Sequence, residues 1–237
     1  AIGTFGGSLA NMEPHELAGT VMKESIARSG VDPQQINYVA VGNVIPTDSR
    51  FAYVSRVASI QAGLPMDSVA MAVNRLCASG LQGVVCAAQN ILLSDSDYGI
   101  GGGVEVMSRG SYMLPAMRSG ARMGDAKAID MMVATLSDPF GVGHMGVTAE
   151  NLAKKWSISR EEQDALAVES QRRAAAAIAE GRFKSQIVPI VMKTRKGDVV
   201  FDTDEHVKAG TTIEAPAKMK PAFRKDGTVT AGNASGI

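Results

Sequence analysis

The chain of 237 residues carries 24 Lys and Arg against 24 Asp and Glu, and this zero net charge excludes binding of nucleic acid or of an anionic membrane through the overall field of the protein. Apolar residues make up 45% and charged residues 20% of the chain, which is typical of a globular protein and excludes a disordered or fibrous one. Two Cys cannot form a disulfide framework and no apolar stretch approaches the ~20 residues of a membrane-spanning helix, so we expect a globular protein of a reducing compartment with neither nucleic acid nor a membrane as partner.

The first part of the chain alternates helical and strand patterns. Pro14 fits the first turn of a helix, and Gly30 marks its end. Patterns of this kind predict helices over residues 14–29, 50–62 and 78–93 and strands over residues 36–41, 69–73 and 98–104. The apolar residues of the third helix follow the 3.6-residue period and are Leu81, Val84, Val85, Ala88 and Leu92. This alternation predicts an α/β fold with a parallel or mixed sheet that is covered by helices on both faces.

A long helix is the main feature of the second part of the chain. Regular alternation ends after about residue 108, and Met, Arg and Gly become frequent. Ser159 and Glu162 form a capping box, which predicts a helix over residues 160–180 that is closed by Gly181.

A hairpin is predicted after this helix. Residues 187–192 and 199–201 are rich in apolar residues and flank the turn Arg195-Lys196-Gly197-Asp198. The part of the chain from about residue 109 to residue 229 is therefore predicted to be an insertion with small elements of its own.

Cys77 lies where a predicted strand passes into a helix, in the stretch Asn74-Arg75-Leu76-Cys77-Ala78-Ser79-Gly80-Leu81-Gln82. The unpaired amides and the positive end of the dipole at a helix start favour a thiolate, which is the nucleophilic form of Cys. The same amides could hold an oxyanion. Most free Cys are buried small side chains, so position alone leaves both interpretations open for Cys77. Cys86, on the opposite face of the same predicted helix, is predicted to lie in the core.

This junction resembles the active-site signature of the thiolase family, in which the Cys takes up an acyl group. Four further segments resemble the family in the same order along the chain: Gly101 to Ser108, His144 to Asn151, Ser159 to Asp164 and Asp226 to Gly236. By itself the run Gly101 to Gly103 would indicate only a tight turn. The resemblance spans essentially the whole chain and implies that Cys77 is the catalytic nucleophile.

The resemblance also implies the fold. We expect a thiolase-like layered α/β fold, in which the N-terminal half has a mixed five-stranded sheet and an inserted loop domain that binds CoA. Residues 1–108 would form the N-terminal domain without its first strand, residues 109–229 the loop domain, and residues 230–237 would return to the sheet. The first strand and the C-terminal half of the family fold are expected to be absent from the chain.

The CoA contacts of the family carry over onto seven positions: Leu136, His144, Met145, Lys208, Phe223, Ala231 and Ser235. The first three would lie beside the pantetheine, Phe223 and Lys208 around the adenine, and Ala231 and Ser235 near the pantetheine amides. Lys208 replaces the Arg often found there, so charge attraction would remain without planar stacking. No cofactor and no metal are expected, because CoA is itself a substrate and product.

The implied activity is acyl transfer through an acyl-cysteine, either condensation of two acetyl-CoA to acetoacetyl-CoA or the reverse thiolysis of a 3-ketoacyl-CoA. Three alternatives are a degradative thiolase for longer chains, a decarboxylating ketosynthase, and a non-catalytic CoA-binding or assembly module. The segments His144 to Asn151 and Thr228 to Gly236 argue against the ketosynthase. Because the catalytic His, second Cys and water-binding Asn of the family belong to its C-terminal half, we expect this chain by itself to be inactive.

The partners implied by the resemblance are acyl-CoA, CoA and further copies of the same protein. Residues 91–106 would pair with another subunit, and residues 112–123 resemble the loop that joins dimers into tetramers. We therefore expect a homodimer or homotetramer. A cytoplasmic location is expected, and a mitochondrial one is left open.

Overall fold

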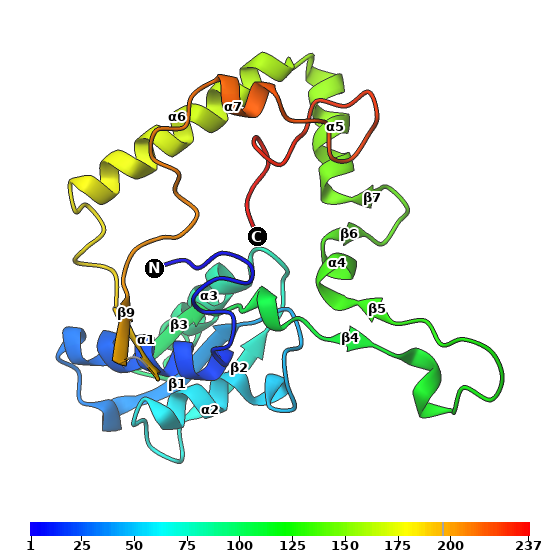
Figure 1. The fold of residues 1–237 in the computed structure, drawn as a ribbon. Helices are drawn as coiled ribbons and strands as arrows, with labels where there is room; N and C mark the ends of the chain where they lie inside the picture. Colours follow the sequence, from blue (N-terminus) through cyan, green and yellow to red (C-terminus); the bar gives the residue numbers. More distant parts are fainter. Residues whose placement is uncertain (196) are drawn as a thin grey trace. The chain divides into compact units, whose positions relative to one another are not determined.

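The computed structural model describes residues 1–195 and 197–237, and Lys196 of the predicted turn lies outside the described residues. The chain forms two compact units (Figure 1). We call Leu9–Met132 the Cys77 unit, and Ala1–Ser8 together with Val133–Ile237 the His144 unit. Within the described ranges, no helix combines the length and the apolar composition needed to cross a membrane.

The predicted alternation of helices and strands is confirmed in the Cys77 unit. Its main elements are α1 (Pro14–Ser29), β1 (Ile36–Gly42), α2 (Val54–Gln61), β2 (Val69–Val73), α3 (Ser79–Leu92) and β3 (Tyr98–Gly103). Shorter elements are the 3₁₀ turns Pro33–Gln35, Phe51–Tyr53, Met107–Arg109 and Pro115–Arg118, and the antiparallel pair β4 (Tyr112–Met113) and β5 (Ile129–Asp130). Helix α4 (Met131–Thr135) crosses from this unit into the other.

The second helix starts later than predicted. A 3₁₀ turn, Phe51–Tyr53, takes the place of the first turn of the helix expected over residues 50–62. The Asp48 carboxylate accepts the N–H of Arg50 at 2.7 Å, and the Asp48 carbonyl accepts the N–H of Phe51 at 3.2 Å. These bonds close a tight turn ahead of α2, because a short carboxylate side chain competes for the backbone groups that a helix would use.

The sheet of the Cys77 unit has the order β2-β1-β3, and both neighbours are parallel to β1. Successive β1 side chains point to opposite faces. Val39 and Val41 join the apolar cluster built by α1 and α2, while Tyr38 and Ala40 pack with Ala87 of α3. Helices therefore cover both faces of the sheet, as predicted.

The α/β fold class is confirmed, while the described residues supply three parallel strands where a mixed five-stranded sheet was expected. Residues 230–237 form turns within the His144 unit, and their return to the sheet stays a prediction. The N–H of Thr230 is bound by Asn233 Oδ1 at 2.7 Å, and the Ala234 N–H by the Thr230 carbonyl at 3.0 Å.

Glycines bring α3 unusually close to the sheet. A Cβ on Gly83 of α3 would lie 2.6 Å from the Gly102 carbonyl oxygen, and one on Gly101 of β3 would lie 2.4 Å from the Val84 Cα. The run Gly101 to Gly103 is thus part of a strand that a helix backbone touches, and the tight turn suggested by the bare run is not present. Glycine is required at these contacts because any side chain would separate helix and strand.

The apolar face of α3 points away from its own sheet. The buried residues of α3 are Ser79, Gly83 and Ala87, whereas Leu81 is 70% and Leu92 82% exposed. The predicted 3.6-residue period is real, but the small residues between the apolar ones form the inner face. An apolar helix face of this size that is left open is typical of an interaction surface.

The His144 unit combines two longer helices with short strand pairs and irregular segments. Its elements are β6 (Ser137–Asp138), β7 (Gly143–His144), α5 (Met145–Trp156), α6 (Arg160–Ala179), β8 (Ile190–Thr194), β9 (Gly197–Phe201) and α7 (Glu214–Ala217). The capping box of α6 is confirmed: Ser159 Oγ accepts the Glu162 N–H, and the Glu162 carboxylate accepts the Ser159 N–H. The predicted hairpin is also confirmed as the antiparallel pair β8–β9. The division between the two units falls after Met132, and the assignment of residues 109–229 to a loop domain stays a prediction.

Candidate functional site

Cys77 lies at the turn between β2 and α3, and it is a free, solvent-exposed thiol. Leu76, the residue before it, has φ 51°, which is the left-handed region that non-glycine residues rarely adopt. Strained conformations of this kind persist only where the surrounding structure holds them. The turn therefore presents the Cys77 side chain to solvent in a defined way at the start of a helix.

Side chains on both sides of Cys77 hold this turn. Asn74 Oδ1 accepts the N–H of Leu76 at 3.0 Å. Ser79 Oγ accepts the N–H of Arg75 at 2.8 Å and donates to the Leu76 carbonyl at 2.6 Å. Backbone N–H and C=O groups that would otherwise lack a hydrogen-bond partner in so tight a turn are thus paired.

Two amides next to Cys77 take part in closing the turn. The N–H of Ala78 binds the Arg75 carbonyl at 3.2 Å, and the N–H of Ser79 binds the Leu76 carbonyl at 2.9 Å. The oxyanion site expected at the start of the helix stays a prediction.

Cys86 sits in a different environment from Cys77. It is partly buried and packs against the cluster of Tyr38, Ala40 and Ala87, and its Sγ accepts a hydrogen bond from Gln82 Nε2 at 3.4 Å. Burial raises the pKa of the Tyr38 hydroxyl, and the neighbouring Cys86 is the second cause of this shift. The predicted core position of Cys86 fits this packing, and the two Cys are clearly separated in accessibility.

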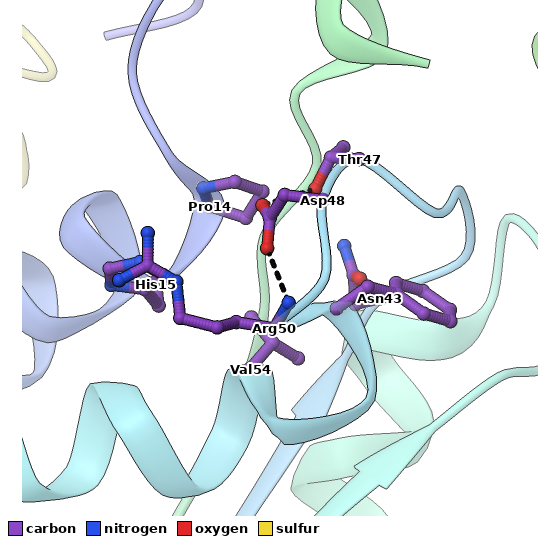
Figure 2. A pocket seen from close by; sticks show the side chains of 8 residues that line it. Pro14, His15, Asn43, Thr47, Asp48, Arg50 and Val54 are labelled. Atoms are coloured by element: carbon purple, nitrogen blue, oxygen red, sulfur yellow. Dashed lines mark hydrogen bonds between the residues drawn. The ribbon is translucent and has the colours of Figure 1, made fainter. Parts of the chain in front are cut away.

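His15, for which the sequence suggests no role, is a structural residue. It is 3% exposed and lines a small hollow with Asn43, Thr47, Asp48 and Arg50 (Figure 2). Its Nδ1 meets Gln61 Oε1 at 3.0 Å and its Nε2 meets Glu13 Oε2 at 2.6 Å. Both ring nitrogens are occupied, so His15 is not available as a proton acceptor for chemistry at Cys77.

The hollow next to His15 is held by charges. Glu13 forms an ion pair with the Arg50 guanidinium. The pKa of the Asp48 carboxyl is lowered. Burial would raise this pKa, but hydrogen bonds from the Arg50 N–H and the Thr47 hydroxyl, together with the charges of Arg50 and Arg109, outweigh the effect of burial. Figure 2 shows Arg50 extending towards His15 while its own N–H binds Asp48. These contacts fasten the loop after β1 to the start of α1.

In the His144 unit, three of the predicted CoA-contacting residues come together. The hairpin β6–β7 pairs Ser137 with His144, and the N–H of Met145 donates to the Leu136 carbonyl at 2.8 Å. His144 then caps α5, because its Nδ1 accepts the N–H of Gly146 at 3.1 Å. Leu136, His144 and Met145 are therefore neighbours at the start of one helix, with Met145 exposed at 42%.

Phe223 joins this group. Its ring stacks on the imidazole of His144, with centroids 5.0 Å apart and planes at 18°. It also lies against the backbone of Gly146, where an added Cβ would come within 2.2 Å of the ring. One face of Phe223 is thus taken by His144, and the adenine contact predicted for Phe223 stays a prediction.

Lys208, Ala231 and Ser235 lie in other segments of the same unit, and all three are exposed. The N–H of Lys208 binds Gln171 Oε1 at 2.8 Å, which ties its backbone to α6. No contact between Lys208 and Phe223 is recorded in the described part of the chain, so their shared role at an adenine stays a prediction.

Two buried acids, which sequence reasoning missed, hold the segment Asp226 to Gly236, in which Ala231 and Ser235 lie. Glu150 of α5 is 4% exposed, and its carboxylate accepts the N–H groups of Thr228 and Val229, each at 2.9 Å. A buried carboxylate is tolerated only with such partners. Glu150 lies inside the segment His144 to Asn151, so its position in that motif is the sequence signal that could have identified it.

A second buried acid, Asp164, fixes the same segment from α6. It is 2% exposed, and it accepts from Arg160 Nε at 2.8 Å and from Asn233 Nδ2 at 2.8 Å. Asn233 in turn holds the N–H of Thr230. The segments Ser159 to Asp164 and Asp226 to Gly236, recognised separately in the sequence, are therefore in direct contact.

Glu205 binds the N-terminal residues of the His144 unit. Its carboxylate accepts the N–H groups of Thr4 at 2.9 Å and Ser8 at 3.2 Å and the hydroxyls of both residues. A Cβ on Gly7 would come within 2.2 Å of this carboxylate, so a larger residue there would push the Glu205 side chain aside. The Ser8 hydroxyl is the largest cause that lowers the pKa of Glu205 to about 2.

This lowered pKa predicts an acid-dependent stability. The charged form of Glu205 is bound in the folded chain, so its stabilisation is present above the ordinary carboxyl pKa of about 4.3 and is lost as the pH falls towards about 2. Glu205→Gln is expected to lower the midpoint of thermal unfolding at pH 7, and the gap to the wild-type protein should close between these two pH values. Unfolding curves at several pH values measure the gap; a gap that stays constant down to pH ~2 would contradict the role of the carboxylate charge.

Comparison with known proteins gives consistent matches over the whole chain. Residues 1–237 match the family described as "Thiolase, N-terminal domain". A beta-ketothiolase (BktB) of Cupriavidus necator is 57% identical over 238 residues, covering 100% of this chain and 60% of that protein.

Two solved structures show the same agreement in three dimensions. The acetyl-CoA acetyltransferase of Bacillus anthracis matches with a TM-score of 0.94 and 44% identity, over 99% of this chain and 59% of that one. Human mitochondrial 3-ketoacyl-CoA thiolase in complex with CoA matches with a TM-score of 0.94 and 37% identity, again over 99% and 59%. The chain thus spans about 60% of the length of the curated relatives it matches.

Proposed function

The chain belongs to the thiolase family, and we propose that it supplies the acyl-accepting cysteine and the CoA-contacting segments of an acetyl-CoA C-acyltransferase. The observation that carries this proposal is the exposed thiol of Cys77 at the start of α3. It lies on a strained turn that is held by hydrogen bonds with neighbouring side chains. A nucleophile needs this combination of access and fixed direction.

The proposed condensation proceeds in two steps. The Cys77 thiolate attacks the thioester carbonyl of acetyl-CoA, and the CoA thiolate leaves and takes up a proton, which gives an acetyl-cysteine. A second acetyl-CoA then loses a methyl proton, and its carbanion attacks the acetyl group, releasing acetoacetyl-CoA and the free thiolate. Thiolysis of a 3-ketoacyl-CoA is the same sequence in reverse.

The second step needs a base. The one histidine among residues 9–132 is His15, and both of its ring nitrogens are occupied, so His15 does not fill this role. We propose that the base belongs to the C-terminal half that the likeness to thiolases implies. General acid–base help of this kind is worth roughly 10²–10⁴-fold in rate, so the 237-residue chain assayed alone should show no measurable turnover.

CoA is the proposed ligand of the His144 unit. The match to a 3-ketoacyl-CoA thiolase whose structure contains CoA supports this choice. The clustering of Leu136, His144, Met145 and Phe223 around the start of α5 supports it further, because it offers an apolar and aromatic surface of the kind that a pantetheine arm contacts.

We further propose that the full-length protein is a homodimer or homotetramer located in the cytoplasm. The loop predicted to join subunits carries exposed apolar side chains, namely Tyr112, Met113, Leu114 and Met117. Exposed groups of this kind are common at contacts between subunits. The two free Cys support a reducing compartment.

A thiolysis assay tests the proposed function. The purified full-length protein should consume acetoacetyl-CoA when CoA is added, with a rate proportional to enzyme concentration, and Cys86→Ser should retain this activity to within about threefold because Cys86 lies away from the exposed turn. Absence of thiolysis in a folded wild-type protein that fails to bind CoA would contradict the proposal.

A further inference from the structure

Ser79 is the side chain that closes the turn around Cys77. It is the first residue of α3 and is 4% exposed, although it carries a polar group. Its Oγ uses both of its functions: it accepts the N–H of Arg75 at 2.8 Å and donates to the carbonyl of Leu76 at 2.6 Å. One hydroxyl thus ties the Asn74–Arg75 peptide to the Leu76–Cys77 peptide, which leads into the nucleophile.

These bonds act where the backbone is least relaxed. Leu76 adopts φ 51°, and its carbonyl accepts two donors, the Ser79 hydroxyl and the Ser79 N–H at 2.9 Å. A non-glycine residue stays in the left-handed region only where its neighbours hold it. Without the hydroxyl, Leu76 would lose one of these restraints and Arg75 would lose the acceptor of its N–H.

Ser79 is itself fixed to the sheet. Gly42 at the end of β1 lies so close that an added Cβ would come within 2.4 Å of the Ser79 carbonyl carbon. Because the hydroxyl proton is donated to Leu76, it is not available for the Cys77 thiol. Any influence of Ser79 on Cys77 therefore passes through the backbone of the turn.

We propose that Ser79 is a positioning residue for acyl transfer, which holds the turn Arg75–Leu76 so that the Cys77 thiol stays at the start of α3. The inference rests on the proposed function, because it assigns Ser79 a role in that reaction. Small misplacements of a reacting group can cost about 10²-fold in rate without loss of binding.

The test compares two buried serines of the Cys77 unit in the full-length protein. Ser79→Ala removes the clamp, whereas Ser59→Ala removes a similar buried bond, from Ser59 Oγ to the Arg56 carbonyl at 2.8 Å, in α2. For Ser79→Ala we expect kcat of thiolysis to fall about 10- to 100-fold while KM for acetoacetyl-CoA stays within about twofold. Ser59→Ala should keep kcat within about twofold. Equal effects of both variants on kcat would overturn the proposal.

A second variant covers the case in which Ser79→Ala does not fold. Asn74 is exposed and holds the same turn from the other side, through the N–H of Leu76. Asn74→Ala should fold and should lower kcat about fivefold or more at unchanged KM, because it releases the Arg75–Leu76 peptide, which lies between the two peptides that Ser79 holds. Wild-type kcat in this variant would contradict a role for the clamped turn.

Alkylation separates this inference from the proposed function. In the wild-type protein iodoacetamide should label Cys77 much faster than Cys86, and Ser79→Ala should lower the ratio of the two rates at least about fivefold because the thiol leaves the helix start. Ser59→Ala should leave the ratio unchanged. If the wild-type protein shows no thiolysis, the proposed function fails, but the ratio of the two labelling rates still tests the role of Ser79. An unchanged ratio in folded Ser79→Ala would overturn the proposal that Ser79 positions Cys77.

Discussion

Replacing Cys77 with serine in the full-length protein is expected to lower thiolysis of acetoacetyl-CoA by at least about 10³-fold, because the covalent step has no other nucleophile at this turn. Oxygen is a far weaker nucleophile than a thiolate at neutral pH. The side chain is exposed, so folding should not suffer. The midpoint of thermal unfolding should therefore change by no more than a surface substitution usually causes.

Cys86→Ser is the matched control for this change. It removes the same sulfur atom from a partly buried site that packs against Tyr38 and Ala87. We expect the opposite pattern, with lower stability and retained turnover. Steady-state rates and unfolding curves on both variants measure the difference; loss of turnover in Cys86→Ser with full activity in Cys77→Ser would reverse the assignment.

Gly83→Ala is expected to destabilise the protein by about 2–3 kcal/mol, which is large for the addition of one methyl group. The new Cβ would lie 2.6 Å from the Gly102 carbonyl oxygen and 2.7 Å from the Ala40 carbonyl oxygen. Both are backbone atoms of the sheet, so neither can rotate away. Helix α3 would have to shift, and Cys77 lies at its start.

Gly102→Ala provides a control in the adjoining strand. No atom lies within 4 Å of a Cβ at Gly102, and its backbone is not in the left-handed region. We expect a change below about 0.5 kcal/mol in the free energy of unfolding. Denaturant unfolding of both variants gives the comparison. Equal stabilities would show that close packing of α3 on the sheet does not govern this unit.

The sequence predicted the elements of the chain well where the signals are local. Pro14, Gly30 and the capping box of Ser159 and Glu162 act within one helical turn, so they could be read without the rest of the fold. The position of Cys77 between a strand and a helix follows from the same signals. Its chemistry was assigned through resemblance, because position alone left a buried cysteine possible.

Features that depend on distant partners could not be predicted. The period of Leu81 and Leu92 showed that they share a face of α3, but not that glycines and Ala87 form the face that meets the sheet. The left-handed Leu76 and the clamp of Ser79 arise from a turn whose shape is set by its own hydrogen bonds. Likewise, Glu150 becomes important only because its carboxylate binds residues far along the chain.

The most direct test of the account is to trap the acyl group. Full-length protein is incubated with acetyl-CoA, quenched in acid and digested, and the peptides containing Cys77 and Cys86 are analysed by mass spectrometry. The account predicts an acetyl group on Cys77 that disappears when CoA is added before the quench, because CoA reverses the transfer. An acetyl group found on Cys86, or none on Cys77 in a protein that turns over acetoacetyl-CoA, would contradict it.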